Sequence, residues 1–234
     1  MKNSLRKHMP TARSGFSLVE MLVVLVIIST LIGVGARVMK SATSAQGSDT
    51  GATIAENVFS EARSLAQSSG VATRVVIYKG GGKGEQREKH LRYMGIVRQK
   101  LADANDSRDE ASQSYQWSNQ LIARGVSLPQ NVFFNANLSG NPPQMSVKIP
   151  GFKAPKSCYY FEFNSEGMLV NHSNTTPAAF VVQSGTLYPS DDKPREAKKG
   201  SRDVAGFAIW KRGNTSLFRN PDQIPSLGQR DPLF

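Results

Sequence analysis

The strongest constraint in this chain is the nearly unbroken apolar run GFSLVEMLVVLVIISTLIGVGA, residues 15–36. As a helix, a run of this length spans about 30 Å, the thickness of the hydrocarbon core of a bilayer. The residues before it include four basic side chains and no acidic one: Lys2, Arg6, Lys7 and Arg13. Positive charge beside an apolar segment tends to stay in the cytoplasm. The pattern therefore predicts a membrane-spanning helix with a cytoplasmic N-terminus and an exported remainder.

Glu20 is unexpected inside such a run. A carboxylate within a membrane-spanning helix costs roughly 2.5–3.5 kcal/mol on insertion scales. A cleaved secretory signal has an apolar region of only about 7–15 residues, and the small residues of SATSA, ending at Ala45, offer it a loose cleavage site. A plain signal anchor explains the length. Neither interpretation explains the glutamate.

The segment GFSLVEMLVVLVII resembles the prepilin motif of type IV pilins and of type II secretion pseudopilins. The resemblance implies that prepilin peptidase cuts between Gly15 and Phe16, that Phe16 becomes an N-methylated terminus, and that Glu20 is an assembly residue. The amine freed on Phe16 would pair with Glu20 of a neighbouring subunit. Such a pair in apolar surroundings sets axial register as much as affinity. The alternative is a glutamate that only reaches the lipid headgroups.

After residue 36 the pattern stays helical, so residues 37–69 are predicted to continue the helix. One face carries Ile54, Val58, Ala62 and Leu65, which predicts an amphipathic segment packed on a globular head. The sequence Ser68-Ser69-Gly70 predicts the end of the helix. Gly47 and Gly51 weaken helices, so the helix is expected to bend or loosen between the two halves.

From residue 70 onward the chain is predicted to form strands, because short segments rich in β-branched and aromatic residues alternate with Gly, Pro, Asn and Asp. These segments are 71–78, 91–98, 145–149, 158–163, 178–183, 204–212 and 215–218. The fold class is therefore α+β: a long N-terminal helix packed on a mainly antiparallel sheet or a small β-sandwich. Within the head at 70–234, a polar insert at 99–141 is either a loop or a short helix. A proline-containing tail at 219–234 should be extended.

The head resembles the FimT/GspH group of H-type minor pseudopilins. The matching residues are FSEARSLAQSSGVATRVVI, followed by FEFNSEGML and the closing AIWKRGNTSLF. This chain departs from the group in a longer 79–145 region. The resemblance implies a leader at 1–15, a membrane and assembly helix at 16–36, and a head carried outside the membrane.

The formal net charge of +11 suits anionic partners such as nucleic acid or lipid headgroups, and it also suits a protein that is merely basic. One loop gathers five cations that are candidates for low-affinity anion binding: Lys79, Lys83, Arg87, Lys89 and Arg92. A second cluster at 193–202 is diluted by neighbouring acidic residues. Some FimT-like minor pilins take part in DNA uptake, so a DNA-binding subunit is an alternative function.

Catalytic signatures are absent from the sequence. No serine lies in a nucleophile-elbow context, the loop at 79–90 lacks the Walker pattern, and the histidines have no zinc-type spacing. Cys158 lies in an aromatic strand and is predicted to be a buried structural thiol. We therefore expect no enzyme activity, no cofactor and no metal.

Together these patterns predict a minor pilin or pseudopilin of a bacterial type II secretion-like or type IV pilus-like filament. Its expected partners are prepilin peptidase, other pilin or pseudopilin subunits, an inner-membrane assembly platform with its ATPase, membrane lipid and, as the alternative, nucleic acid. The expected location is the inner membrane, single-pass with a periplasmic head, and then a filament. A third alternative is a periplasmic domain that stays anchored and is never processed.

Overall fold

The structure is a computed structural model that describes residues 18–80, 86–101, 115–170, 177–191, 193–196, 203–219 and 221–223. The chain divides into two compact units, Met1–Ala42 and Thr43–Phe234. The second unit confirms the predicted α+β class, because a helix packs on two mostly antiparallel sheets.

A single helix, α1, runs from Leu18 to Ser69. Gly70 follows it with a φ of 66° and donates its backbone N–H to the carbonyl of Ala66 at 3.0 Å, which is the usual left-handed helix stop. The predicted end of the helix is confirmed. Among the residues that the structure describes, no helix is both long and apolar enough to cross a membrane. Of the span predicted at 16–36, residues 16–17 and the side chains of 32–36 lie outside those described.

The part of α1 in the second unit buries a face made mostly of small residues. Phe59 lies at its centre and is 1% exposed, and it is flanked along the helix by Ala52, Ala55, Ala62 and Ala66. The predicted face was centred on larger residues, but Ile54 and Leu65 are only half-buried. Alanines allow the sheets to approach the helix closely, and the single large ring of Phe59 then fills the space between them.

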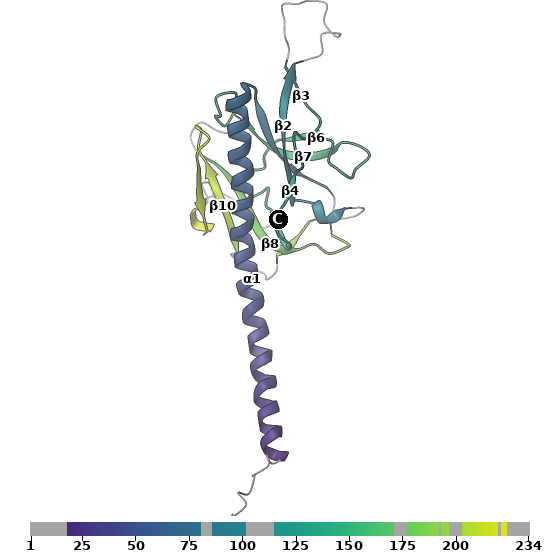
Figure 1. The fold of residues 1–234 in the computed structure, drawn as a ribbon, viewed down its shortest axis with the longest axis vertical. Helices are drawn as coiled ribbons and strands as arrows, with labels where there is room; N and C mark the ends of the chain where they lie inside the picture. Colours follow the sequence, from purple (N-terminus) through teal and green to yellow (C-terminus); the bar gives the residue numbers. More distant parts are fainter. Residues whose placement is uncertain are drawn as a thin grey trace, which may run out of the picture. The chain divides into compact units, whose positions relative to one another are not determined.

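The first sheet has the strand order β3-β2-β1-β7-β6, with β4 also paired to β2. Its strands are β1 (Thr73–Tyr78), β2 (Tyr93–Leu101), β3 (Tyr115–Trp117), β4 (Val126–Ser127), β6 (Gln144–Val147) and β7 (Lys156–Phe163). All of these pairings are antiparallel. Figure 1 shows β2, β7 and β6 together beside the second half of α1.

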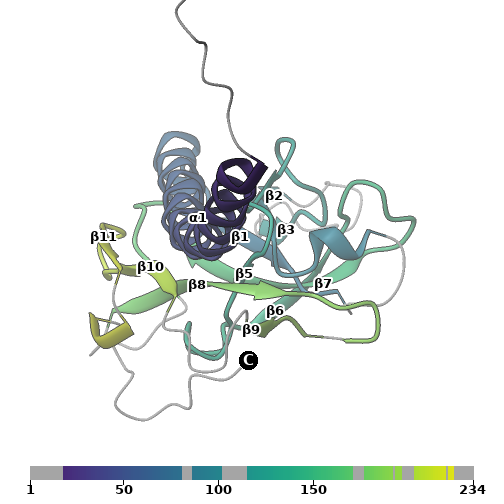
Figure 2. The same ribbon diagram turned by 90° about the horizontal axis from the view of Figure 1, so that it is seen from below.

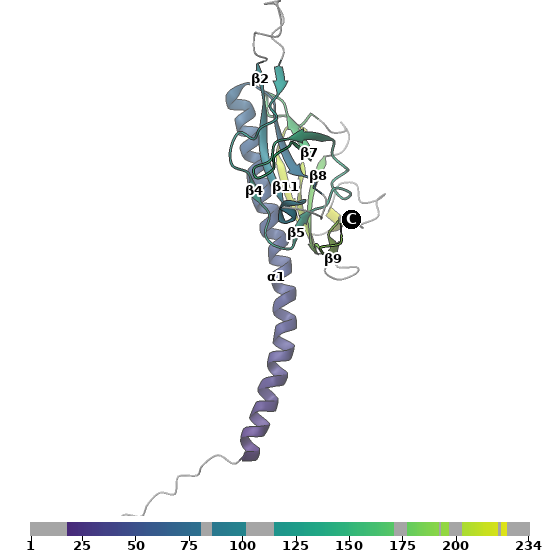
Figure 3. The ribbon, with the colours of Figure 1, turned by 90° about the vertical axis from the view of Figure 1, so that its right-hand side faces the viewer.

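The second sheet has the order β11-β10-β8-β5, with β9 also paired to β8. Its strands are β5 (Val132–Phe134), β8 (Ala178–Thr186), β9 (Arg195–Glu196), β10 (Val204–Ile209) and β11 (Thr215–Phe218). Figure 2 shows the strands spread beneath α1, with β10 and β11 at one side and β6 and β7 at the other. Figure 3 shows both sheets on the same side of the second half of α1. Two short 3-10 helices, η1 (Arg87–Lys89) and η2 (Pro221–Gln223), complete the described elements.

Both sheets and the helix share one core. The ring of Phe59 meets Phe161 and Phe163 of β7, and also Phe180 of β8 and Phe207 of β10, with centroid separations between 5.0 and 6.2 Å. Aromatic pairs at these distances add about 0.5–1.5 kcal/mol each beyond the area they bury. One side chain of the helix therefore contacts both sheets.

The polar insert at 99–141 contains the end of β2 and all of β3, β4 and β5, while residues 102–114 lie outside the described part of the chain. Strand β5 is fully buried and pairs with β8. Gly47 and Gly51 face it from α1, and a Cβ on Gly51 would lie only 2.9 Å from Cγ1 of Val132. These glycines stand within α1 and allow the close approach of β5.

Candidate functional site

The first part of α1 presents an apolar surface on every side. Between Leu18 and Leu31 the large apolar side chains are 44–83% exposed: Leu18, Val19, Met21, Leu22, Val23, Val24, Leu25, Val26, Ile27, Ile28 and Leu31. A helix whose whole surface is apolar is stable where its surroundings are also apolar, either in a membrane or among other helices. Patches of this kind on a protein surface mark interaction sites.

The two hydroxyl groups in this segment do not interrupt its apolar character. Ser29 donates its hydroxyl to the carbonyl of Leu25 at 2.7 Å, and Thr30 donates to the carbonyl of Ile27 at 2.8 Å. Because each hydroxyl bonds to the backbone of its own helix, neither needs a polar partner from outside. Glu20 is then the one charged side chain between Leu18 and Leu31.

Glu20 lies in the first turn of α1 and is exposed. A carboxylate in apolar surroundings is costly, so its presence in this segment requires a compensating interaction. The predicted processing residues, Gly15 and Phe16, lie outside the described residues, so the cleavage site stays a prediction.

The cations predicted as an anion-binding loop contact the protein itself around η1. Arg87 donates to the carbonyl of Leu187 at 2.6 Å, and Lys89 donates to the carbonyl of Pro150 at 2.7 Å. Arg92 donates to the carbonyl of Leu128 at 2.8 Å, and burial lowers the pKa of its guanidinium, opposed by the nearby charge of Glu88. These three side chains tie neighbouring loops together.

Lys79 from the same predicted loop lines the pocket described below, and Lys83 lies outside the described residues. Anion binding by the loop therefore stays a prediction. Lys198, Lys199 and Arg202 of the second cluster also lie outside the described part of the chain.

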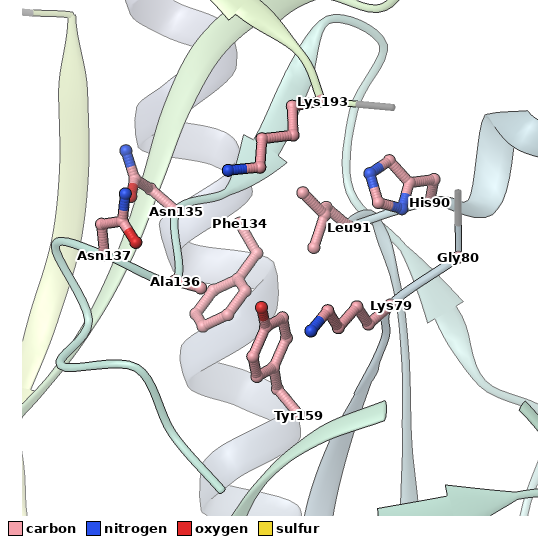
Figure 4. A pocket seen from close by; sticks show the side chains of 10 residues that line it. All are labelled: Lys79, Gly80, His90, Leu91, Phe134, Asn135, Ala136, Asn137, Tyr159 and Lys193. Atoms are coloured by element: carbon pink, nitrogen blue, oxygen red, sulfur yellow. The ribbon is translucent and has the colours of Figure 1, made fainter. Parts of the chain in front are cut away.

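A pocket of about 280 Å³ opens between the two sheets (Figure 4). Its walls come from segments far apart in the sequence: the end of β1, the turn before β2, the end of β5 and the residues after it, β7, and the segment before β9. Lys79 and Lys193 supply two ammonium groups, Tyr159 supplies a hydroxyl and part of its ring, and Leu91 and Phe134 are buried at the back of the pocket. The sequence marked Lys79 and Lys193 as members of separate clusters and gave no sign that they meet.

Cys158 is buried in β7, as predicted. It lies in a second cluster on the face of the first sheet that includes Val76, Tyr78 and Val97. Burial raises the pKa of its thiol to about 12, which keeps it protonated and unreactive at neutral pH. Among the described residues, no group of three or more His, Cys, Asp or Glu side chains is placed to hold a metal ion.

Comparison with known protein families finds one match, to the family model for the prokaryotic N-terminal methylation motif, over residues 10–36. The match supports a prepilin-like subunit. It covers the end of the basic segment and the apolar run, and so includes Gly15, Phe16 and Glu20. Proteins with this motif are pilin-like structural subunits that are processed by prepilin peptidase and assemble with one another. No curated protein and no solved structure matches the chain.

Proposed function

We propose that this protein is a minor pilin or pseudopilin that works in a type II secretion-like or type IV pilus-like filament. The observation that carries the proposal is the coincidence of the methylation motif at 10–36 with a helical segment, Leu18–Leu31, that is apolar on all sides and carries one carboxylate. The head, with its FimT/GspH-like sequence features, is the part carried on the outside of the filament.

In this proposal the precursor enters the inner membrane through residues 16–36, with the leader at 1–15 in the cytoplasm and the head in the periplasm. Prepilin peptidase cuts after Gly15 and methylates Phe16. The subunit then moves from lipid into the filament, where the apolar side chains of Leu18–Leu31 pack against the helices of neighbouring subunits. An ATPase at the inner-membrane platform supplies the energy.

Glu20 has a specific role in this transfer. Cleavage leaves a positively charged amine on Phe16, at the end of an apolar helix. An unpaired charge in apolar surroundings costs several kcal/mol, and removing one partner of a buried pair costs about 3–5 kcal/mol. The Phe16 amine of one subunit and the Glu20 carboxylate of a neighbour therefore stabilise the filament only when the two helices stand in the correct axial register.

The experiment compares Glu20→Ala, Glu20→Gln and Glu20→Asp in cells that contain the assembly machinery. We expect Glu20→Ala and Glu20→Gln to be processed normally but to enter filaments at least tenfold less, as measured by cross-linking and by the amount in sheared filament fractions. Glu20→Asp should keep much of the assembly, because it keeps the charge. Ser29→Ala is the matched control on the same helix and should assemble normally.

The decisive variant is Glu20→Gln, which keeps the size and hydrogen-bonding capacity of the side chain but not its charge. Normal assembly of Glu20→Gln would contradict the pairing mechanism. Absence of the unmodified chain from any filament, together with an intact leader, would favour an anchored periplasmic domain over the proposed function.

A further inference from the structure

We propose that the pocket between the two sheets is a binding site for a carboxylate attached to an apolar group. Lys79 and Lys193 would hold the carboxylate, with the Tyr159 hydroxyl as a further donor, and the apolar part would lie on the half-buried Ala136 and the ring of Tyr159. The volume of about 280 Å³ is slightly below the usual range for drug-sized ligands, about 300–1,000 Å³, and suits a small aromatic or branched aliphatic acid. The inference does not depend on the proposed role in a filament.

The charge of the pocket favours an anion. Its lining contains two lysines and no acidic residue. Asp191, two residues before Lys193, pairs with Arg195 through contacts of 2.6 and 2.9 Å. Lys193 itself is exposed, and its neighbour Asp192 lies outside the described residues.

Lys79 is held in place by neutral groups. Its ammonium donates to the side-chain carbonyl of Gln144 at 3.2 Å and lies 5.1 Å from the centroid of the Tyr159 ring. The same Gln144 oxygen also accepts a hydrogen bond from Ser157. The Gln144 carbonyl and the Tyr159 ring orient the Lys79 ammonium, and because both groups are neutral they do not cancel its charge. A carboxylate that enters the pocket therefore gains a charge-assisted hydrogen bond.

The apolar lining is rigid because the core lies directly behind it. Phe134 is fully buried, its ring centroid lies 5.0 Å from that of Phe180, and its backbone N–H donates to the carbonyl of Leu91 at 2.8 Å. The next residue, Asn135, is also buried and donates to the side chain of Gln183 at 2.8 Å. A ligand therefore meets a preformed surface and loses little free energy to ordering the protein.

The positions of the side chains define what the site recognises. Figure 4 shows the Lys193 ammonium extending over the pocket from one side and the Lys79 ammonium on another, with the Tyr159 hydroxyl directed inward beside the Phe134 ring. An acid with an apolar body fits this arrangement, whereas a phosphate or sulfate alone would leave the apolar wall uncovered.

The test uses the full chain in lipid nanodiscs, with 3-phenylpropanoate as the probe and 3-phenylpropanamide as the neutral control. Both compounds partition into lipid, so binding is read from saturable methyl shifts of Leu91 and Ala136 by NMR. We expect the acid to shift both signals and to bind at least tenfold more tightly than the amide. Its affinity should fall as salt rises, because the charges lie near the surface.

The variants Lys79→Gln and Lys193→Gln should each weaken binding of the acid about tenfold or more, because each removes a charge-assisted hydrogen bond to the carboxylate. Lys148→Gln is the matched control, because Lys148 is an exposed lysine that does not line the pocket. The proposal is overturned if the acid and the amide bind equally, or if Lys79→Gln and Lys193→Gln bind the acid as tightly as Lys148→Gln does.

A second arm identifies the source of the carboxylate. If the acid also competes with assembly of the chain, the natural ligand is an acidic residue of an adjoining protein. If assembly is unaffected by saturating acid, the ligand is a free small acid. In both cases the pocket binds a carboxylate. Failure of the filament proposal would leave the binding result unchanged, because the nanodisc measurement requires no assembly.

Discussion

Two stretches of the same helix have opposite surroundings. Between Leu18 and Leu31 the side chains are bulky, aliphatic and exposed on all sides, whereas residues 52–66 bury a narrow face of alanines around Phe59. Small residues allow close packing against a partner that the chain itself provides, namely the two sheets. Bulky aliphatic residues around the whole helix require apolar surroundings, and in our account lipid and then neighbouring subunits supply them. Small residues thus mark the stretch of α1 that packs within the chain. Bulky aliphatic residues mark the stretch that, in our proposal, packs against other chains.

The largest expected effect comes from Phe59→Ala. This substitution removes the ring that contacts four phenylalanines of both sheets, so we expect the free energy of unfolding of the head to fall by about 3–5 kcal/mol. Denaturant unfolding of the full chain in detergent, followed by the fluorescence of half-buried Trp117, measures the change. Val24→Ala in the exposed stretch is the control and should change the result by less than about 0.5 kcal/mol. Equal losses of stability for Phe59→Ala and Val24→Ala would contradict the contrast between the two stretches of the helix.

A smaller effect is expected from Gly51→Ala. In an exposed helix this change stabilises by about 1 kcal/mol. Here the added Cβ would lie 2.9 Å from Cγ1 of buried Val132, and overpacking of this kind costs about 1–3 kcal/mol, so we expect a net loss of stability. Gly47→Ala meets one contact at 3.3 Å and should be milder. Stabilisation of the head by Gly51→Ala would show that the helix is not tightly packed on β5.

Thr73→Val tests one polar contact between helix and sheet. The buried Thr73 hydroxyl donates to the carbonyl of Ala62 at 2.9 Å, so its loss should cost about 0.5–1.5 kcal/mol. Thr53→Val is the matched control, since the exposed Thr53 hydroxyl bonds only to the backbone of its own helix turn. A shift in melting temperature for Thr73→Val, with little change for Thr53→Val, is the expected result. A larger shift for Thr53→Val than for Thr73→Val would be inconsistent with the packing of Thr73 against the helix.

The smallest effect is expected from Cys158. Ionisation of its buried thiol lowers the stability of the head only in alkaline solution, so nothing changes near neutral pH. Burial raises the pKa of its thiol from 9.0 to about 12, and burial likewise raises the phenol pKa values of Tyr78 and Tyr93. A folded-state pKa above the unfolded value contributes stability that is complete below about pH 9 and is lost as pH rises toward 12. The melting temperature of the head should fall over this interval, less steeply in Cys158→Ala. A flat profile in the unmodified chain would contradict the burial argument.

Sequence patterns predicted the elements better than their contacts. Seven segments rich in β-branched and aromatic residues are strands, and the helix ends at the expected serine–glycine sequence. The short strand β5 was missed because Val132, Phe133 and Phe134 form too brief an apolar run within a polar insert to be recognised. The place of β5 in the core depends on its contact with Gly47 and Gly51, about eighty residues earlier in α1. A local sequence pattern does not reveal a contact between segments so far apart in the chain.

The two candidate sites also differ in how well the sequence predicts them. The processing motif is local and contiguous, so its residues could be proposed from the sequence and agree with a family model that spans them. The pocket is assembled from segments that tertiary folding brings together, and its lysines were scattered among charges that looked solvated. Local motifs are visible in a single sequence, whereas a pocket that depends on the pairing of two sheets is not.

Mass spectrometry of the N-terminus decides whether the chain is processed as a prepilin. The full chain is expressed together with a prepilin peptidase, purified from membranes and analysed as an intact protein and as peptides. The account predicts that residues 1–15 are absent and that the chain begins with N-methylated Phe16. A chain that retains Met1, or one that is cut after Ala45, would contradict it.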